Sequence, residues 1–155
     1  MSKIYLARPH AFIVSHMKDF LARNGYQTEP LQTLEELSMA SFAGAAGAVI
    51  STAVSSTVGG RVVDAFTRIR KEAPTLPIAF ATLLPFDQAV ASLRSQLDLT
   101  DDRRFVKPDL NAEKAPGLGT EKTFIVLHLD AIRIGSDTSL ADTLVRRHFS
   151  SSEST

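Results

Sequence analysis

Hydroxyl side chains are concentrated in one short part of the sequence, where an apolar run ends. Ser51 and Thr52 follow the run Ala48–Ile50, and three more hydroxyl residues stand at positions 55–57. Hydroxyl groups and loop amides bind phosphate and similar anions, so this part of the chain is a candidate anion site. It lacks the Gly-Lys-Ser/Thr core of a nucleotide-binding P-loop, and an ordinary polar loop has the same composition. We therefore favour a polar loop over an anion site here.

The other residue types that often do chemistry form no recognisable set. The four histidines, at positions 10, 16, 128 and 148, are scattered, and the first two are six residues apart. That is not the spacing of zinc ligands on one helix face. The chain has no cysteine, which removes disulfides, thiol catalysis and thiolate-bound metal. We expect no enzymatic activity, no metal and no cofactor.

Length and charge limit the class of protein further. The chain has 155 residues, of which 44% are hydrophobic, and 17 basic and 17 acidic residues give a formal net charge of zero. This length suits one domain with its own core, and the neutral balance makes nucleic-acid binding unlikely. No stretch has the apolar length of a signal peptide or of a membrane-spanning helix. We expect a cytoplasmic protein with no membrane contact.

Short apolar runs alternate with amphipathic stretches along the first two thirds of the chain. Apolar residues at helical spacing predict helices around 12–21, 34–42, 62–69 and 86–97. Short stretches between turn signals predict strands at 3–7, 26–30, 46–50, 78–81 and 104–107, and the central ones are apolar without alternation, as in parallel sheets covered on both faces. The predicted fold is α/β, with a flavodoxin-like, doubly wound sheet of five parallel strands in the order 2-1-3-4-5.

The last third of the chain is less regular. Residues 112–120 contain Pro116, Gly117 and Gly119, which predicts a linker. The apolar run 124–129 fits either a strand or a buried helix, because periodicity alone does not separate the two. Apolar residues at 140–149 predict a C-terminal helix. We therefore divide the chain into an α/β core at 1–111 and a segment at 112–155 that completes or extends the same domain.

Several local patterns, in order along the chain, are typical of one family. Ala48–Ser51 is an apolar strand with a hydroxyl at its end, and Gly59 lies eight residues after Ser51. Pro77–Thr82 is a buried strand that ends in Thr, and Phe105–Pro108 carries a Lys-Pro pair. In this order and spacing the chain resembles, from residue 3 to 111, the receiver domain of bacterial two-component response regulators.

The resemblance implies a site where the chain departs from the family. Receivers transfer a phosphoryl group to an Asp, using an acidic pair after strand one to hold Mg²⁺ and a Lys to neutralise charge. At those positions this chain has Ala7-Arg8 or Arg8-Pro9 for the acids, depending on the alignment, and Ser51 for the acceptor, while Thr82 and Lys107 are kept. The resemblance thus implies a degenerate phosphorylation site made of Arg8, Pro9, Ser51, Thr82 and Lys107. The chain therefore resembles a pseudo-receiver, in which the usual aromatic switch position falls on Arg104.

The resemblance also implies how such a module acts. Receivers contact partners through a face made by helix four, strand five and helix five, which points here to Leu93, Arg104, Phe105 and Phe124. We expect a phosphorylation-independent signalling or adaptor module that binds a protein partner, such as a signalling protein or kinase, or forms a homodimer. The alternative is an anion- or nucleotide-binding regulator or enzyme that uses the corner of Ser51, Lys107 and Arg8. A flavin carrier is disfavoured, since the loop after the first strand is not rich in hydroxyls.

Overall fold

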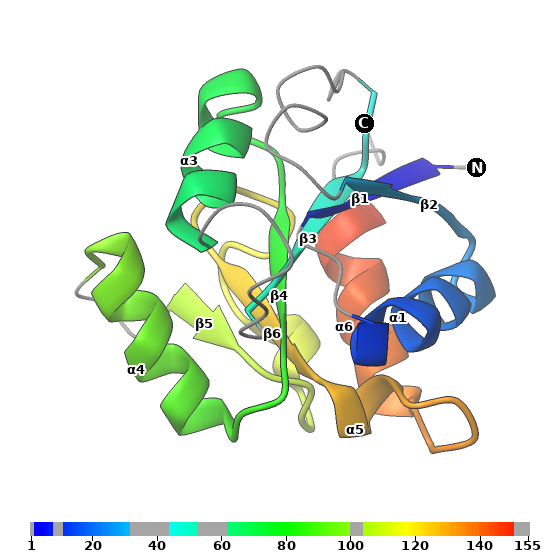
Figure 1. The fold of residues 1–155 in the computed structure, drawn as a ribbon. Helices are drawn as coiled ribbons and strands as arrows, with labels where there is room; N and C mark the ends of the chain where they lie inside the picture. Colours follow the sequence, from blue (N-terminus) through cyan, green and yellow to red (C-terminus); the bar gives the residue numbers. More distant parts are fainter. Residues whose placement is uncertain (1, 8–10, 32–43, 53–61, 100–103, 151–155) are drawn as a thin grey trace.

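The computed structural model contains one parallel sheet between two layers of helices (Figure 1). It describes residues 2–7, 11–31, 44–52, 62–99 and 104–150. The strands are β1 (Ser2–Ala7), β2 (Tyr26–Leu31), β3 (Gly47–Ser51), β4 (Ile78–Thr82), β5 (Phe105–Val106) and β6 (Phe124–His128). They pair in the order β2-β1-β3-β4-β6-β5, and every pairing is parallel. The α/β class with a receiver-like, doubly wound sheet is thus confirmed.

Helices cover both faces of this sheet. Helices α1 (Ala11–Arg23) and α6 (Ser139–Ser150) lie on one face, and α3 (Val62–Glu72) and α4 (Phe86–Leu97) lie on the other (Figure 1). Alternate residues of one strand serve the two cores: Ile125 and Leu127 of β6 pack towards α1 and α6, while Phe124 and Val126 pack towards α3 and α4. Strands buried on both sides must be apolar throughout, which explains the lack of alternation in the sequence.

The sheet has six strands rather than the predicted five, and the difference lies at one edge. The predicted fifth strand, at 104–107, is a two-residue edge strand, β5. The strand next to β4 is β6, from the run whose structure the sequence left open. A five-residue run with four buried apolar side chains fills the space beside β4 better than a two-residue one, since burial of apolar area drives the packing.

Residues 104–123, which we call the edge segment, connect α4 to β6 and cover the outer side of β6. The segment contains β5 and the 3₁₀ turn η2 (Ala112–Lys114), where the sequence predicted a linker from 112. Leu118 is buried in the core on the α6 side. The backbone N–H of Gly119 donates to Nδ1 of His148 on α6, with an N···N distance of 3.0 Å. The edge segment is therefore anchored to both the sheet and α6.

The remaining elements come after β6 in the chain. A four-residue helix, α5 (Leu129–Ile132), begins directly after it, and α6 closes the described chain, as the apolar spacing at 140–149 predicted. The helix predicted at 34–42 lies outside the described residues. Within the described part of the chain, no helix has the length and apolar character needed to cross a membrane.

Candidate functional site

The candidate site lies where the central strands end, at the bottom of Figure 1. In doubly wound sheets, ligands bind outside the carboxyl ends of the strands. The last residues of β1, β3, β4 and β6 are Ala7, Ser51, Thr82 and His128. Thr82 and His128 are direct neighbours in the sheet register, and Ser51 is paired with Ala81.

The hydroxyl groups at this end are turned into the protein. Ser51 and Thr82 are both buried. The Thr82 hydroxyl accepts a hydrogen bond from the backbone N–H of Leu84 at 3.0 Å, and the Thr52 hydroxyl donates to the Ala81 carbonyl at 3.1 Å. The first hydrogen bond fixes the turn after β4, and the second ties Thr52 to β4. A buried hydroxyl is poorly placed to attack or to bind an anion from solvent.

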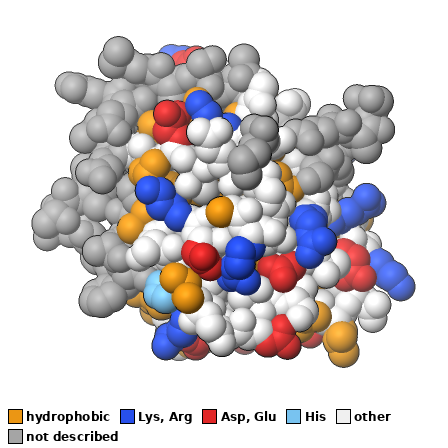
Figure 2. Space-filling view, turned by 90° about the vertical axis from the view of Figure 1, so that its right-hand side faces the viewer, with side chains coloured by type: hydrophobic (Ala, Val, Ile, Leu, Met, Phe, Trp, Pro, Cys, Tyr) orange, Lys and Arg blue, Asp and Glu red, His pale blue; other side chains and the backbone are white. Residues whose placement is uncertain are grey.

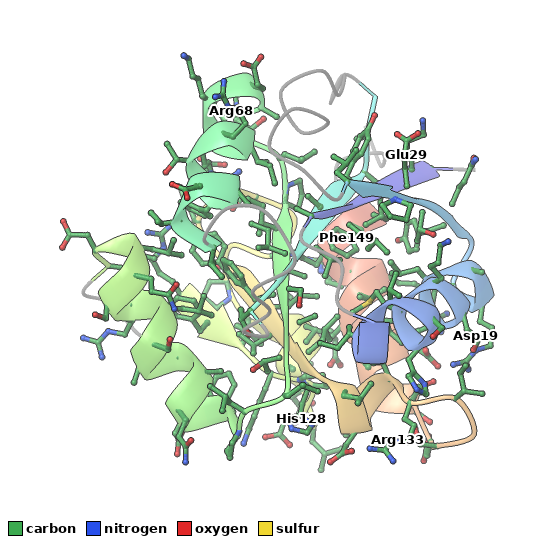
Figure 3. All side chains as sticks on the ribbon, viewed as in Figure 1. Asp19, Glu29, Arg68, His128, Arg133 and Phe149 are labelled. Carbon is green, nitrogen blue, oxygen red and sulfur yellow. The ribbon has the colours of Figure 1, made fainter. Side chains whose placement is uncertain are left out.

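His128 is the site residue that the sequence did not single out (Figure 3). Its Nδ1 accepts a hydrogen bond from the backbone N–H of Asp130 at 3.0 Å, which caps α5. Since Nδ1 accepts, Nε2 is the nitrogen that carries the proton, and it lies 3.2 Å from the Leu83 carbonyl oxygen. The imidazole thus joins the β4–α4 turn to α5. The sequence signal for His128 was its position at the end of the apolar run 124–127. Using that signal required knowing that the run forms a strand beside β4.

Lys107 does not lie beside Thr82, because β6 separates β5 from β4. The Lys107 side chain is exposed, and its Nζ lies 5.4 Å from the centroid of the Phe86 ring at the start of α4. The sheet register puts His128 where the Lys-Pro resemblance had put Lys107. Arg8 and Pro9 fall outside the described residues.

Magnesium is the ion that a receiver-like fold implies, and the donor set at this end does not fit it. A hollow between α1 and the strand ends has Ser51 as its one polar side chain among the described residues. In the sequence, neither 8–10 nor 52–61 contains an Asp or Glu. Mg²⁺ is held in proteins mainly by carboxylate oxygens and water. The hollow is lined by Leu6, Ala7, Ile13, Val14, Met17, Val49, Ser51 and Ala81.

The residues predicted for a partner face lie mostly inside the protein. Leu93, Phe105 and Phe124 are buried in the core under α3 and α4. The Phe124 ring centroid is 5.5 Å from that of Phe105 and 5.5 Å from that of Phe80. The edge segment supplies this packing, so these side chains are not available on the surface of the folded chain.

Arg104, the fourth residue predicted for that face, stabilises the edge segment itself. Its guanidinium carbon lies 4.8 Å from the Phe124 ring centroid, and its nitrogens donate to the carbonyls of Glu121 and Lys122 at 3.1 and 2.9 Å. The guanidinium of Arg70 on α3 lies near the same ring, 5.9 Å from its centroid. Burial lowers the pKa of Arg70 to about 10, an effect that Glu121 opposes and Arg104 reinforces. The two cations thus help to fix the segment before β6.

Comparison with known proteins supports the fold. No model of a protein family and no curated protein matches the sequence. Solved structures do match: a response regulator receiver domain from Clostridium thermocellum has a TM-score of 0.56 and 12% identity, covering 99% of this chain and 98% of that one. The receiver domain of a sensor histidine kinase from Pseudomonas aeruginosa, which has magnesium in its active-site cleft, has a TM-score of 0.58 and 11% identity. That match covers 97% of this chain and 98% of the other.

A third solved structure that matches is also a receiver domain of low sequence identity. The signal receiver domain of an HD domain-containing protein from Pseudomonas fluorescens gives a TM-score of 0.56 and 11% identity, covering 99% of this chain and 98% of that chain. At such low identity the likeness defines the class of fold, which is the receiver-type α/β fold, and nothing more specific.

Proposed function

We propose that this chain is a pseudo-receiver, a signalling or adaptor module that acts through protein–protein contacts without being phosphorylated. One observation supports this most directly. The receiver-type frame is present, but its functional end has Ser51 in place of the acceptor carboxylate and His128 in place of the cation, and the sequence has Arg8 and Pro9 in place of the acidic pair. A receiver-type fold that lacks the groups for phosphoryl transfer can still bind other proteins through its surface.

The surface available for such contacts differs from the one first expected. The edge segment covers β6, so a partner or homodimer that used the β6 edge would have to displace Phe105 and Leu118 from the core. Two exposed apolar side chains lie at the carboxyl end instead, Leu83 and Leu84 in the β4–α4 turn, which are 41% and 43% exposed. The side of α1 carries charges of both signs intermixed, with hydrophobic side chains in small groups (Figure 2). We propose a signalling protein, such as a kinase, as the partner at the carboxyl end.

The alternative of an anion-binding regulator or enzyme has less support. It needs Ser51, Arg8 and Lys107 to converge on one pocket. Ser51 is buried, and Lys107 lies beyond β6. A phosphate group there would meet an apolar hollow.

An amide NMR titration with Mg²⁺ and beryllofluoride, which mimics an aspartyl phosphate, tests phosphorylation independence. We expect no saturable shift at Ser51, Thr82 or His128, because a tight complex needs a carboxylate and a bound metal. A receiver domain with its acids intact, titrated in parallel, is the positive control. Saturable shifts at these amides would show a working phosphorylation switch and would contradict the proposal.

A further inference from the structure

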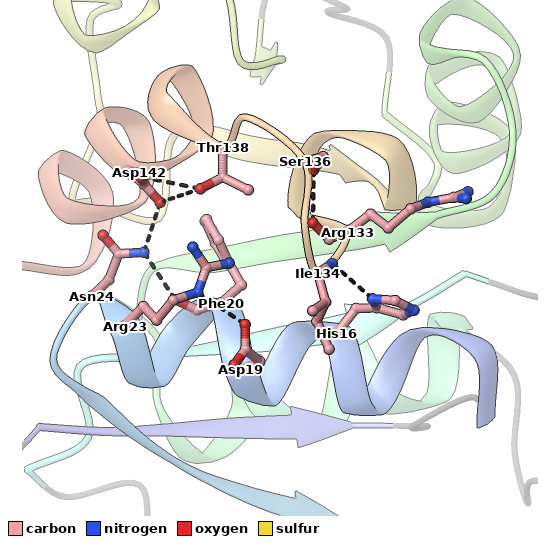
Figure 4. Close-up of polar contacts among 10 residues, drawn as sticks. All are labelled: His16, Asp19, Phe20, Arg23, Asn24, Arg133, Ile134, Ser136, Thr138 and Asp142. Atoms are coloured by element: carbon pink, nitrogen blue, oxygen red, sulfur yellow. Dashed lines mark hydrogen bonds and ion pairs between the residues drawn. The ribbon is translucent and has the colours of Figure 1, made fainter.

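The segment of residues 129–134, which follows β6, is held at both ends by a histidine that accepts a backbone hydrogen bond. At its start, Nδ1 of His128 accepts from the N–H of Asp130. At its end, Nδ1 of His16, on α1, accepts from the N–H of Ile134 at 3.0 Å (Figure 4). His16 and Ile134 are 118 positions apart in the sequence. The two imidazoles therefore attach one short segment to β6 and to α1.

These bonds require neutral imidazoles. A neutral ring has one nitrogen that accepts, whereas an imidazolium has two donors and no acceptor. Uptake of a proton at Nδ1 therefore removes both bonds. Histidine is the side chain that normally changes charge between pH 5 and 8.

The charged groups around the segment determine which contacts a protonated imidazole makes. The carboxylate of Asp130 lies 3.5 Å from Nδ1 of His128, and it also accepts from Arg133 at 2.8 Å. A protonated His128 thus exchanges the N–H of Asp130 for the carboxylate of the same residue. The other charged groups on the packed elements are Lys18 and the Asp19–Arg23 pair on α1, Arg94 and the exposed Asp87 on α4, and Asp137 before α6. On α6 they are Arg147 and the two residues that bind Asn24, Asp142 and Arg146.

The side chains of the segment are anchored in the core, since Ile132 is fully buried and Leu129 and Ala131 pack against the same cluster, so the two histidines hold its backbone. Helix α5 is only four residues long, and such a short helix depends on its caps and contacts. Ile134 is 53% exposed. We propose that His16 and His128 form an acid-sensitive latch on the backbone of residues 129–134, which is closed when both imidazoles are neutral and open, with the hydrogen bonds from the N–H groups of Asp130 and Ile134 lost, when they are protonated. Opening changes the surface beside the carboxyl ends of β4 and β6, whether or not the chain binds a partner.

Amide NMR from pH 8 to pH 5 tests the latch. We expect the amide signals of Asp130 and Ile134 to shift with the same midpoints as the ring signals of His128 and His16. Hydrogen exchange at these two amides, corrected for the intrinsic rate, should become about fivefold faster, which corresponds to the loss of one hydrogen bond. The amide of Val126, in the buried strand β6, reports that the fold remains intact.

The matched control is the double variant His16→Asn and His128→Asn. An Asn side chain can accept the same hydrogen bonds and is a strong helix N-cap, but it does not titrate. In this variant the two amides should keep constant shifts over the same pH range. The latch is refuted if the wild-type amides stay constant while the rings titrate, or if the shifts persist in the double variant. The single variants assign the effect to one end of the segment if the double variant does not fold.

Discussion

At the scale of single residues, the most informative side chain is His148 on α6. It is fully buried, with Nδ1 accepting from the N–H of Gly119 and Nε2 3.0 Å from the Ile78 carbonyl oxygen. Burial is the largest cause that lowers its pKa, from 6.5 to about 4, and the hydrogen bond to Ile78 opposes it. The folded pKa is below the unfolded one, so the neutral form contributes stability above pH 6.5 that is lost as the pH falls towards 4. Full loss corresponds to about 3 kcal/mol.

Urea denaturation at pH 7 and pH 4.5 measures this effect. The wild-type free energy of unfolding should fall by about 2 to 3 kcal/mol between the two conditions, beyond the change in a His148→Gln variant. The variant is less stable at pH 7 but lacks the titrating group, so its stability should depend less on pH. An equal pH dependence of the two proteins would show that His148 does not carry the effect.

At the scale of elements, the edge segment is part of the core rather than a loose connection. Phe105 of β5 packs its ring against Phe80 and Phe124. Replacing a buried Phe with Ala usually costs about 3 to 5 kcal/mol, so Phe105→Ala should lower the free energy of unfolding by that amount. Leu110, in the same segment, is 78% exposed, so Leu110→Ala is the matched control and should change it by less than about 0.5 kcal/mol. Equal, small effects would mean that the segment does not pack as described.

The edge segment also shows which elements the sequence could predict. Strands β1, β3 and β4 were predictable because each is a short apolar run between helical patterns or turn residues, and the mostly polar β2 because it directly follows the turn at Asn24 and Gly25. The strand that pairs with β4 was not predictable, because this pairing depends on which of two later stretches packs best beside β4, and the two are far from β4 in the sequence. A Lys-Pro pattern after Phe105 indicated one partner, while the buried packing of Phe124 against Phe80 selects the other. The prediction for Lys107 depended on the wrong strand, and so His128 was missed as a site residue.

At the scale of the whole molecule, the segment after residue 111 lies at the centre of the structure. It supplies β6, which pairs with β4 on one side and β5 on the other, and α6, whose Phe149 is buried against the sheet. The close packing is visible at Gly47 of β3, where a Cβ atom would overlap the Phe149 ring. The predicted core at 1–111 would leave the edge of β4 without its neighbouring strand and would lack the helix α6 that packs beside α1.

A truncation tests whether the two predicted parts fold as one unit. We expect residues 1–150 to unfold in a single cooperative transition, followed by both circular dichroism and fluorescence, as small single domains do. Residues 1–111 should show no cooperative transition, because the exposed β4 edge and the loss of β6 and α6 remove much of the buried apolar area that stabilises the fold. The first protein is the control, since it removes only residues 151–155. A cooperative transition in residues 1–111 alone would mean that the later segment is an addition to an already stable core.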